Sequence, residues 1–159
     1  THETELQERF TAKIGLEGGD AGDWSMVETL LAAMAEGEAD FTLVFRHLSD
    51  ALETGCDDAV TRLFKQPAAI VAWLTGWRSH LHEANRSQAV ALMRQTNPVF
   101  IPRNHRIEEA IAAANGGDFE PFGQLNDVLQ HPFTPQATFA EYEAAPLAEE
   151  VVHATFCGT

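Results

Sequence analysis

The histidines and the paired carboxylates are the first residues whose types suit metal binding. His80 and His82 are two residues apart, which turns them about 200° away from each other on a helix, whereas a zinc-binding helix carries its histidines at i and i+4. Glu83 does not restore that spacing. Asp57 and Asp58 resemble the acidic first turn of a helix and lack the ligand spacing of a calcium loop. The sequence therefore predicts no metal-binding residues.

Three tripeptides imitate parts of protein kinase motifs without completing them. His105-Arg106-Ile107 begins like His-Arg-Asp, but Ile107 stands where the acid is required. Asp40-Phe41-Thr42 and Asp118-Phe119-Glu120 resemble Asp-Phe-Gly without its glycine, and both lie at expected helix starts, where Asp is a common cap. There is also no glycine-rich phosphate loop. These residues therefore predict neither catalytic nor cofactor-binding side chains.

The chain has two cysteines, Cys56 and Cys157. Two are too few for a disulfide framework or a zinc site, and they fit a reducing compartment. Cys157 lies in a final segment without helical periodicity, so we expect an exposed thiol that oxidants can reach. Cys56 precedes an expected helix start and should be the more buried and structural of the two. Ser-His-Asp and Cys-His arrangements remain open, although no strained nucleophile turn is visible.

Composition narrows the classes of partner. The 159 residues are 45% hydrophobic and 21% charged, which is typical of one globular domain or of a piece of a larger protein. Asp and Glu number 24 against 10 Lys and Arg, a net charge of −14, and such a surface repels nucleic-acid phosphates and anionic membranes. No run approaches the roughly 20 apolar residues of a membrane span. The first residues carry no secretory signal. We therefore expect neither nucleic acid nor membrane as a partner.

Helical periodicity dominates the chain, and we find neither repeats nor sustained strand alternation. The expected fold class is all-α, an irregular multi-helix array. Gly15 should end the first helix, Ser25 and Glu28 have capping-box spacing, and Asp40 and Asp118 should cap later helices. The residues expected to face inward are Leu6, Phe10, Ile14, Leu30, Leu31, Met34, Phe41, Val44, Phe45, Leu48, Val60, Leu63, Phe64, Ile70, Leu74, Trp77, Leu81, Val90, Met93, Ile107, Ile111, Ala114, Phe122, Leu125, Val128 and Leu129.

A proline-flanked segment interrupts the helical pattern at residues 97–102. Pro98 and Pro102 each disfavour helical conformation in the residue before them, so the segment from Asn97 should be an extended connector. The next residues have structural interpretations. Arg103 should bind the carbonyls of a helix end, and Asn104 should be the N-cap of the following helix.

Three stretches together resemble the selenoprotein O family. Residues 97–111 read NPVFIPRNHRIEEAI and, with Gly117-Asp118 after them, resemble part of the C-terminal region of that family. Residues 39–49, ADFTLVFRHLS, resemble a second family segment, and residues 156–159, FCGT, resemble the bacterial form of its terminal cysteine or selenocysteine motif. The stretches occur in the family's order. The residues singled out as structural or family-motif positions are Asn97, Pro98, Arg103 and Asn104.

The resemblance implies a pseudokinase-like enzyme that transfers AMP from ATP, with Mg or Mn, to Ser, Thr or Tyr hydroxyls of other proteins. The catalytic, ATP-binding and metal-binding residues of the family lie in a kinase-like core, and no residue of this chain matches them. The chain would then be the C-terminal helical part of the kinase-like fold, with a helical region at 1–131 and a proline-punctuated tail at 132–159. Its partners would be the core of its own full-length chain and the protein substrates.

The resemblance also implies a redox role for Cys157 and a bacterial, cytoplasmic protein. Two alternatives remain open. One is a free-standing helical protein-interaction module without catalytic activity, and the other is a small helical enzyme complete in these residues. A kinase-like core encoded upstream of Thr1 would decide for the first interpretation.

Overall fold

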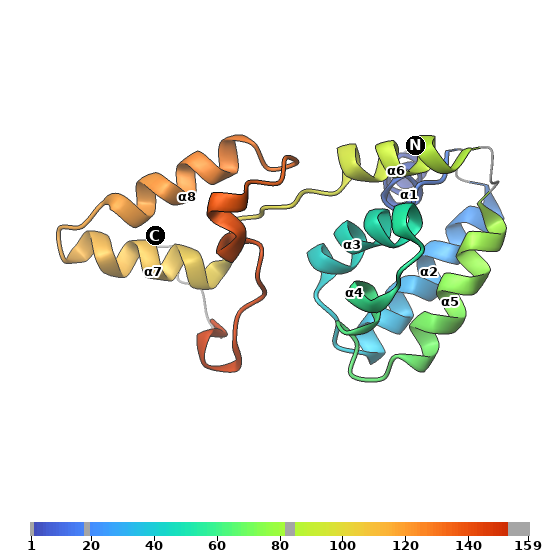
Figure 1. Ribbon diagram of the computed structural model, residues 1–159, viewed down its shortest axis with the longest axis horizontal. Helices are drawn as coiled ribbons and strands as arrows, with labels where there is room; N and C mark the ends of the chain where they lie inside the picture. Colours follow the sequence, from blue (N-terminus) through green and yellow to red (C-terminus); the bar gives the residue numbers. More distant parts are fainter. Residues whose placement is uncertain (1, 18–19, 82–84, 153–159) are drawn as a thin grey trace. The chain divides into compact units, whose positions relative to one another are not determined.

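The computed structural model describes residues 2–17, 20–81 and 85–152. Within these ranges the chain is helical and contains no strand, which confirms the all-α prediction. The chain divides into two compact units, Thr1–Pro98 (unit 1) and Val99–Thr159 (unit 2) (Figure 1). The predicted break in the helical pattern is confirmed, because residues 97–103 adopt no helix, and the backbone is extended at Asn97 and Arg103.

Unit 1 is a bundle around one hydrophobic core. Its helices are α1 (His2–Lys13), α2 (Ala21–Glu36), α3 (Phe41–Thr54), α4 (Asp58–Thr61), α5 (Ala68–His80) and α6 (Arg86–Thr96). Helix α3 packs against α6 and α4, α1 packs against α6 and α2, and α2 packs against α5. The side chains buried most completely include Trp77, Phe45, Ile14, Leu30, Leu48, Ile70, Leu74 and Met93.

Unit 2 is a helical hairpin with a short irregular segment packed on it. Its elements are α7 (Asn104–Asn115), α8 (Glu120–Gln130) and two 3-10 helices, η2 (Ala137–Tyr142) and η3 (Ala148–Glu150). The N–H groups of Val99 and Phe100 both donate to the Pro132 carbonyl, at 2.7 and 3.0 Å. This fixes the start of the unit against the turn after α8. Its core is small and consists of Val99, Phe100, Ala110, Leu125, Val128 and Tyr142.

Of the two helix caps predicted in unit 1, one is confirmed and the other is wrong. The Asp40 side chain accepts a hydrogen bond from the Leu43 N–H at 2.8 Å, so the predicted cap of α3 is confirmed. The predicted capping box at Ser25 is wrong. Asp20 accepts a hydrogen bond from the Asp23 N–H at 2.9 Å and starts α2 earlier, which leaves Ser25 inside the helix.

The caps of the two helices in unit 2 are each displaced by one residue. Arg103, not Asn104, occupies the cap position of α7, and its side chain makes no capping hydrogen bond. Phe119 occupies the cap position of α8, although the Asp118 carboxylate still accepts a hydrogen bond from the Glu120 N–H at 3.0 Å. A carboxylate one residue before the cap position can therefore accept a hydrogen bond from a backbone N–H of the first helical turn.

Several residues expected to face inward are exposed instead. Leu6 is 48% exposed, because α1 packs through its C-terminal end, where Thr11 and the following Ile14 are buried. Phe41, Ile111 and Phe122 are 46%, 49% and 61% exposed. Their helical spacing is regular, but the elements packed around them leave about half or more of each side chain exposed. Cys56 is exposed, and because Cys157 lies outside the described residues, the expectation that Cys56 is the more buried of the two cysteines stays a prediction.

Candidate functional site

The segment that resembles the family motif begins at a buried asparagine. Asn97 is 1% exposed, and its Nδ2 donates to the carbonyls of Lys13 and Phe45 at 2.8 and 3.3 Å. Its Oδ1 accepts a hydrogen bond from Lys13 Nζ at 3.3 Å, and its backbone N–H donates to the Met93 carbonyl at 2.8 Å. The side chain therefore ties the end of α1 and the middle of α3 to the end of α6, and its buried polar atoms have partners.

The residue after Asn97 explains why α6 ends there. Pro98 disfavours helical conformation at Asn97, whose backbone angles are φ −104° and ψ 114°. The chain leaves unit 1 directly after this pair. Asn97 and Pro98 therefore fix the exit point on the side of unit 1.

Lys13 has an unusual environment for a lysine. Its Nζ lies 5.2 Å from the centre of the Phe45 ring and 5.8 Å from that of Phe41, within cation–π distance of both. Burial lowers the pKa of the Lys13 amine below its usual value. Among the described residues, its only hydrogen-bond acceptor is the neutral side chain of Asn97.

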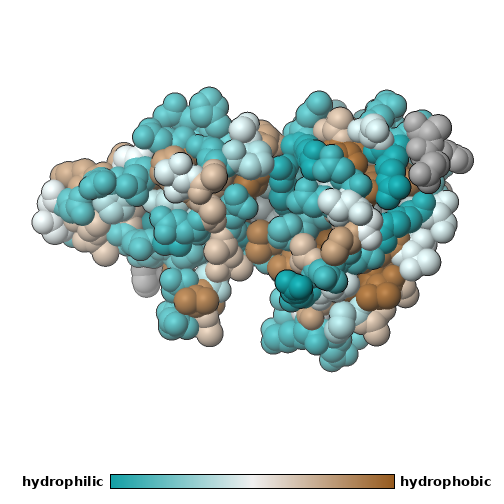
Figure 2. All heavy atoms as spheres, viewed as in Figure 1, coloured by the Kyte–Doolittle hydropathy of each residue, from teal (hydrophilic) through white to brown (hydrophobic). Residues whose placement is uncertain are grey.

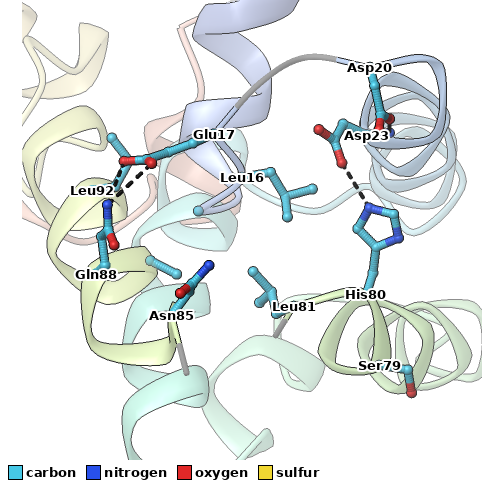
Figure 3. Close-up of a pocket in the computed structure, with 12 residues that line it drawn as sticks. Leu16, Glu17, Asp20, Asp23, Ser79, His80, Leu81, Asn85, Gln88 and Leu92 are labelled. Carbon is cyan, nitrogen blue, oxygen red and sulfur yellow. Dashed lines mark hydrogen bonds and ion pairs between the residues drawn. The ribbon is translucent and has the colours of Figure 1, made fainter. Parts of the chain in front are cut away.

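A cavity of about 530 Å³ lies in unit 1 (Figure 3). The loop after α1, the start of α2, the end of α5 and the N-terminal half of α6 line it, and they contribute Gly15, Leu16, Glu17, Asp20, Asp23, Ser79, His80, Leu81, Asn85, Gln88, Ala89 and Leu92. Three of these residues are carboxylates, and His80 is the one residue among them that can become cationic. The lining therefore disfavours anionic ligands such as phosphates.

Two polar contacts link the walls of this cavity. His80 Nε2 lies 2.8 Å from Asp23 Oδ1, and the Asp23 side chain is only 10% exposed. Gln88 Nε2 donates to both carboxylate oxygens of Glu17, at 3.0 and 3.2 Å (Figure 3). Ser79 also lines the cavity, but its hydroxyl donates to the Thr75 carbonyl at 3.0 Å. The contacts of these described residues do not form a Ser-His-Asp relay.

Asp57, the first residue of the acidic pair Asp57-Asp58, has a structural role. The Asp57 carboxylate accepts hydrogen bonds from both terminal nitrogens of Arg78, and Arg78 also donates to the Ala51 carbonyl at 3.1 Å. This ion pair raises the pKa of Arg78. It joins the end of α3 to α5. No group of three or more metal-binding side chains lies together in residues 2–17, 20–81 and 85–152.

The start of α7 gathers three basic side chains in unit 2. Arg103 and His105 are 7% and 9% exposed. Arg106 pairs with Glu109 at 2.8 Å, donates to the Glu141 carbonyl at 3.1 Å and lies 5.3 Å from the centre of the Tyr142 ring. Burial, and then the positive charge of Arg106, lowers the pKa of His105. The low exposure of Arg103 suits an anchor, while helix-end carbonyls as its partners remain a prediction.

The family-motif residues are divided between the two units. Asn97 and Pro98 end unit 1, and Arg103 and Asn104 belong to unit 2, where Asn104 is exposed. Cys157, the predicted redox residue, lies outside the described residues. Sequence reasoning missed the Lys13–Asn97 and Asp23–His80 contacts, which join residues 84 and 57 positions apart. No local spacing signals such pairs.

In the part of the chain that the structure describes, no helix has the length and apolar character needed to cross a membrane.

Comparison with known proteins identifies relatives along almost the whole chain. The family model "Protein adenylyltransferase SelO" matches residues 1–130. The protein nucleotidyltransferase YdiU of Ruegeria sp. (strain TM1040) is 46% identical over 151 residues, which cover 95% of this chain and 30% of the relative. The protein of the same name from Rhodopseudomonas palustris (strain HaA2) is 47% identical over 154 residues, covering 94% of this chain and 31% of the relative.

The chain thus spans about a third of the length of these curated relatives. The resemblance of residues 39–49 and 97–111 to selenoprotein O is confirmed, because both stretches lie inside the matched region. The chain belongs to the SelO family of protein adenylyltransferases.

Proposed function

We propose that this chain is the helical C-terminal part of a protein adenylyltransferase that transfers AMP from ATP to Ser, Thr or Tyr hydroxyls of proteins. The observation that carries the proposal is the 46% identity over 95% of the chain to a relative named a protein nucleotidyltransferase. Measurement of AMP transfer by the complete protein tests the activity. A free-standing interaction module is the less favoured alternative, because the matched relatives extend far beyond the matched region.

The described residues do not fit ATP and its metal. The cavity in unit 1 is lined by three carboxylates, which oppose a triphosphate. Among the described residues, no three His, Cys, Asp or Glu side chains lie together in a group that could hold a metal ion. We therefore assign the binding of ATP and of Mg or Mn to the kinase-like core of the full-length protein.

Unit 2 exposes apolar side chains that can pack on that core. Six of the nine large apolar side chains that are exposed among the described residues belong to it: Ile111, Phe119, Phe122, Phe133, Leu147 and Val151. Figure 2 shows that hydrophilic residues cover much of the visible face, with apolar residues between them. Exposed phenylalanines at 66% and 61%, as in Phe119 and Phe122, are typical of surfaces that another part of a protein covers. The partner of this surface is then the protein's own kinase-like core.

The packing role is tested in the complete protein. The double change Phe119→Ser and Phe122→Ser should lower AMP transfer and the melting temperature of the complete protein, while leaving unit 1 of the isolated chain unchanged. The matched control is Val71→Ser, at an apolar position of α5 that is 49% exposed. Equal effects of the two changes, or none from either, would count against unit 2 as the docking surface.

The redox role of Cys157 is part of the same proposal. Disulfide exchange requires that oxidants and the partner thiol can reach the cysteine, because a thiolate attacks the sulfur atom directly. In the complete protein under oxidant, Cys157 should form a disulfide with a cysteine of the core and change the rate of AMP transfer. Cys157→Ser should remove this response and Cys56→Ser should keep it. A response that survives Cys157→Ser would end the redox assignment.

A further inference from the structure

One wall of the cavity in unit 1, the α2 wall, consists of Asp20, Asp23 and His80 (Figure 3). The Asp20 side chain accepts a hydrogen bond from the Asp23 N–H at 2.9 Å, and His80 Nε2 lies 2.8 Å from Asp23 Oδ1. The Asp23 side chain is only 10% exposed, yet its second oxygen, Oδ2, has no hydrogen-bond donor among the described residues. Because Asp23 lines the cavity, this nearly buried oxygen can accept a hydrogen bond from a ligand there.

The other wall, the α6 wall, consists of Glu17, Asn85 and Gln88. Gln88 Nε2 donates to both carboxylate oxygens of Glu17, at 3.0 and 3.2 Å. The amide of Gln88 is neutral, so this contact orients the Glu17 carboxylate and leaves its negative charge uncompensated. The Asn85 side chain also lines the cavity and has no hydrogen-bond partner in the described part of the chain. Figure 3 shows Leu16 and Leu81 between the two walls.

The charges of the two walls favour a cationic ligand. Among the described lining residues there are three carboxylates, one histidine and neither lysine nor arginine. The lining is therefore negative whether or not His80 is protonated, and a concave site strengthens the attraction of a cation. A metal ion does not fit, because no three metal-binding side chains lie together in the described ranges.

The division of charge between two walls favours an elongated ligand. A molecule with one cationic group at each end can reach both walls, and methylene groups between its ends can contact Leu16 and Leu81. A volume of about 530 Å³ lies within the range of small-molecule sites. Alkyl amines, with a pKa of about 10.4, are charged at neutral pH and donate up to three hydrogen bonds each.

We propose that this cavity binds a small linear diamine. One ammonium group donates to Asp23 Oδ2, and the other donates to the Glu17 carboxylate and to the side-chain oxygen of Asn85. The methylene groups displace water from Leu16 and Leu81. Since the ligand joins the α2 wall to the α6 wall, its binding also stabilises the folded state of unit 1.

Calorimetric titration of the complete protein with putrescine, without ATP or metal, tests the ligand class. Salt at about 0.15 M weakens unspecific attraction to the acidic surface. We expect saturable binding and a higher melting temperature. Butylamine has one amine and butanediol has none, so both should bind at least about fivefold more weakly. No saturable binding of putrescine, or equal binding of butylamine, would overturn the proposal.

Two substitutions test the location of the site. Glu17→Gln and Asp23→Asn each remove one charge, from opposite walls, and each should weaken putrescine binding by about 5- to 30-fold. The matched control is Glu36→Gln, which removes a charge at an exposed position of α2 outside the cavity and should change the affinity by less than about twofold.

The exposed Glu17 decides the result even if Asp23→Asn disturbs folding. If Glu17→Gln binds putrescine like the unchanged protein, or if Glu36→Gln weakens binding equally, the diamine is attracted by the overall charge and the proposal fails. This inference does not depend on the proposed enzymatic function, because the comparison isolates unit 1 and AMP transfer is not measured.

Discussion

Lys13 and Asn97 bind each other twice, although 84 positions separate them in the sequence. The Asn97 side chain donates to the Lys13 carbonyl at 2.8 Å, and the Lys13 amine donates back to the Asn97 side-chain oxygen at 3.3 Å. Both contacts lie at the position where the chain passes from unit 1 to unit 2. The first residue of the family motif in residues 97–111 thus has an architectural role in unit 1.

Asn97→Ala tests that role. The change removes two donated hydrogen bonds and leaves the Phe45 carbonyl and the Lys13 carbonyl with one partner fewer, so we expect a loss of about 2–4 kcal/mol in the free energy of unfolding. Urea unfolding of the chain measures it. Asn104→Ala, at an exposed residue of the same motif, should change stability by no more than about 0.5 kcal/mol. Equal effects of the two changes would contradict the architectural role.

Two glycines should respond to alanine in opposite directions. A Cβ at Gly37 would lie 2.5 Å from Cδ1 of Phe64, a side chain that is only 5% exposed, so Gly37→Ala should cost roughly 1–3 kcal/mol. A Cβ at Gly76 in α5 meets no atom within 4 Å, and Gly76→Ala should add about 0.5–1 kcal/mol of stability. Thermal melts of the two variants check the signs. A stabilising Gly37→Ala would show that the Phe64 ring is not held against α2.

We predict that protonation of His105 destabilises the folded chain at mildly acidic pH. Burial lowers its pKa in the folded chain, with Arg106 and Arg103 adding to this and Glu150 and Glu109 opposing it. The unfolded chain therefore binds the proton more readily, and stability falls as pH drops through the unfolded-state value of about 6.5. The loss levels off below the folded-state pKa.

The measurement is a series of urea unfolding curves between neutral pH and about pH 5. His105→Gln should flatten the dependence of stability on pH in this window, whatever its effect on the absolute stability. An unchanged slope would mean that the charged form of His105 is accommodated in the fold.

The features that could be predicted from sequence are those set by neighbouring residues. Asp40 caps α3 because a carboxylate can reach an N–H three residues ahead, and Pro98 ends α6 through its steric effect on Asn97. The prediction of a capping box at Ser25 is wrong for a related reason. Asp20 competes for the same helix start and binds the Asp23 N–H, and no local rule ranks one cap above the other.

Exposure and long-range contacts could not be predicted in this way. Phe122 has the spacing of a buried residue but is 61% exposed, because burial depends on which elements pack on a helix face and not on the spacing within that helix. The Asp23–His80 contact joins α2 and α5 across 57 positions. The pairing of these two helices decides that contact, and the period of either helix alone does not contain that information.

AMP transfer tests the central claim most directly. The complete protein and the present chain are each incubated with ATP, Mg or Mn and a mixture of candidate proteins, and mass spectrometry locates AMP on Ser, Thr or Tyr side chains. We expect AMP on protein hydroxyls with the complete protein and none above background with the chain alone. Transfer by the chain alone, or no transfer by a folded complete protein with either metal, would contradict the proposal that this chain is the C-terminal part of a protein adenylyltransferase.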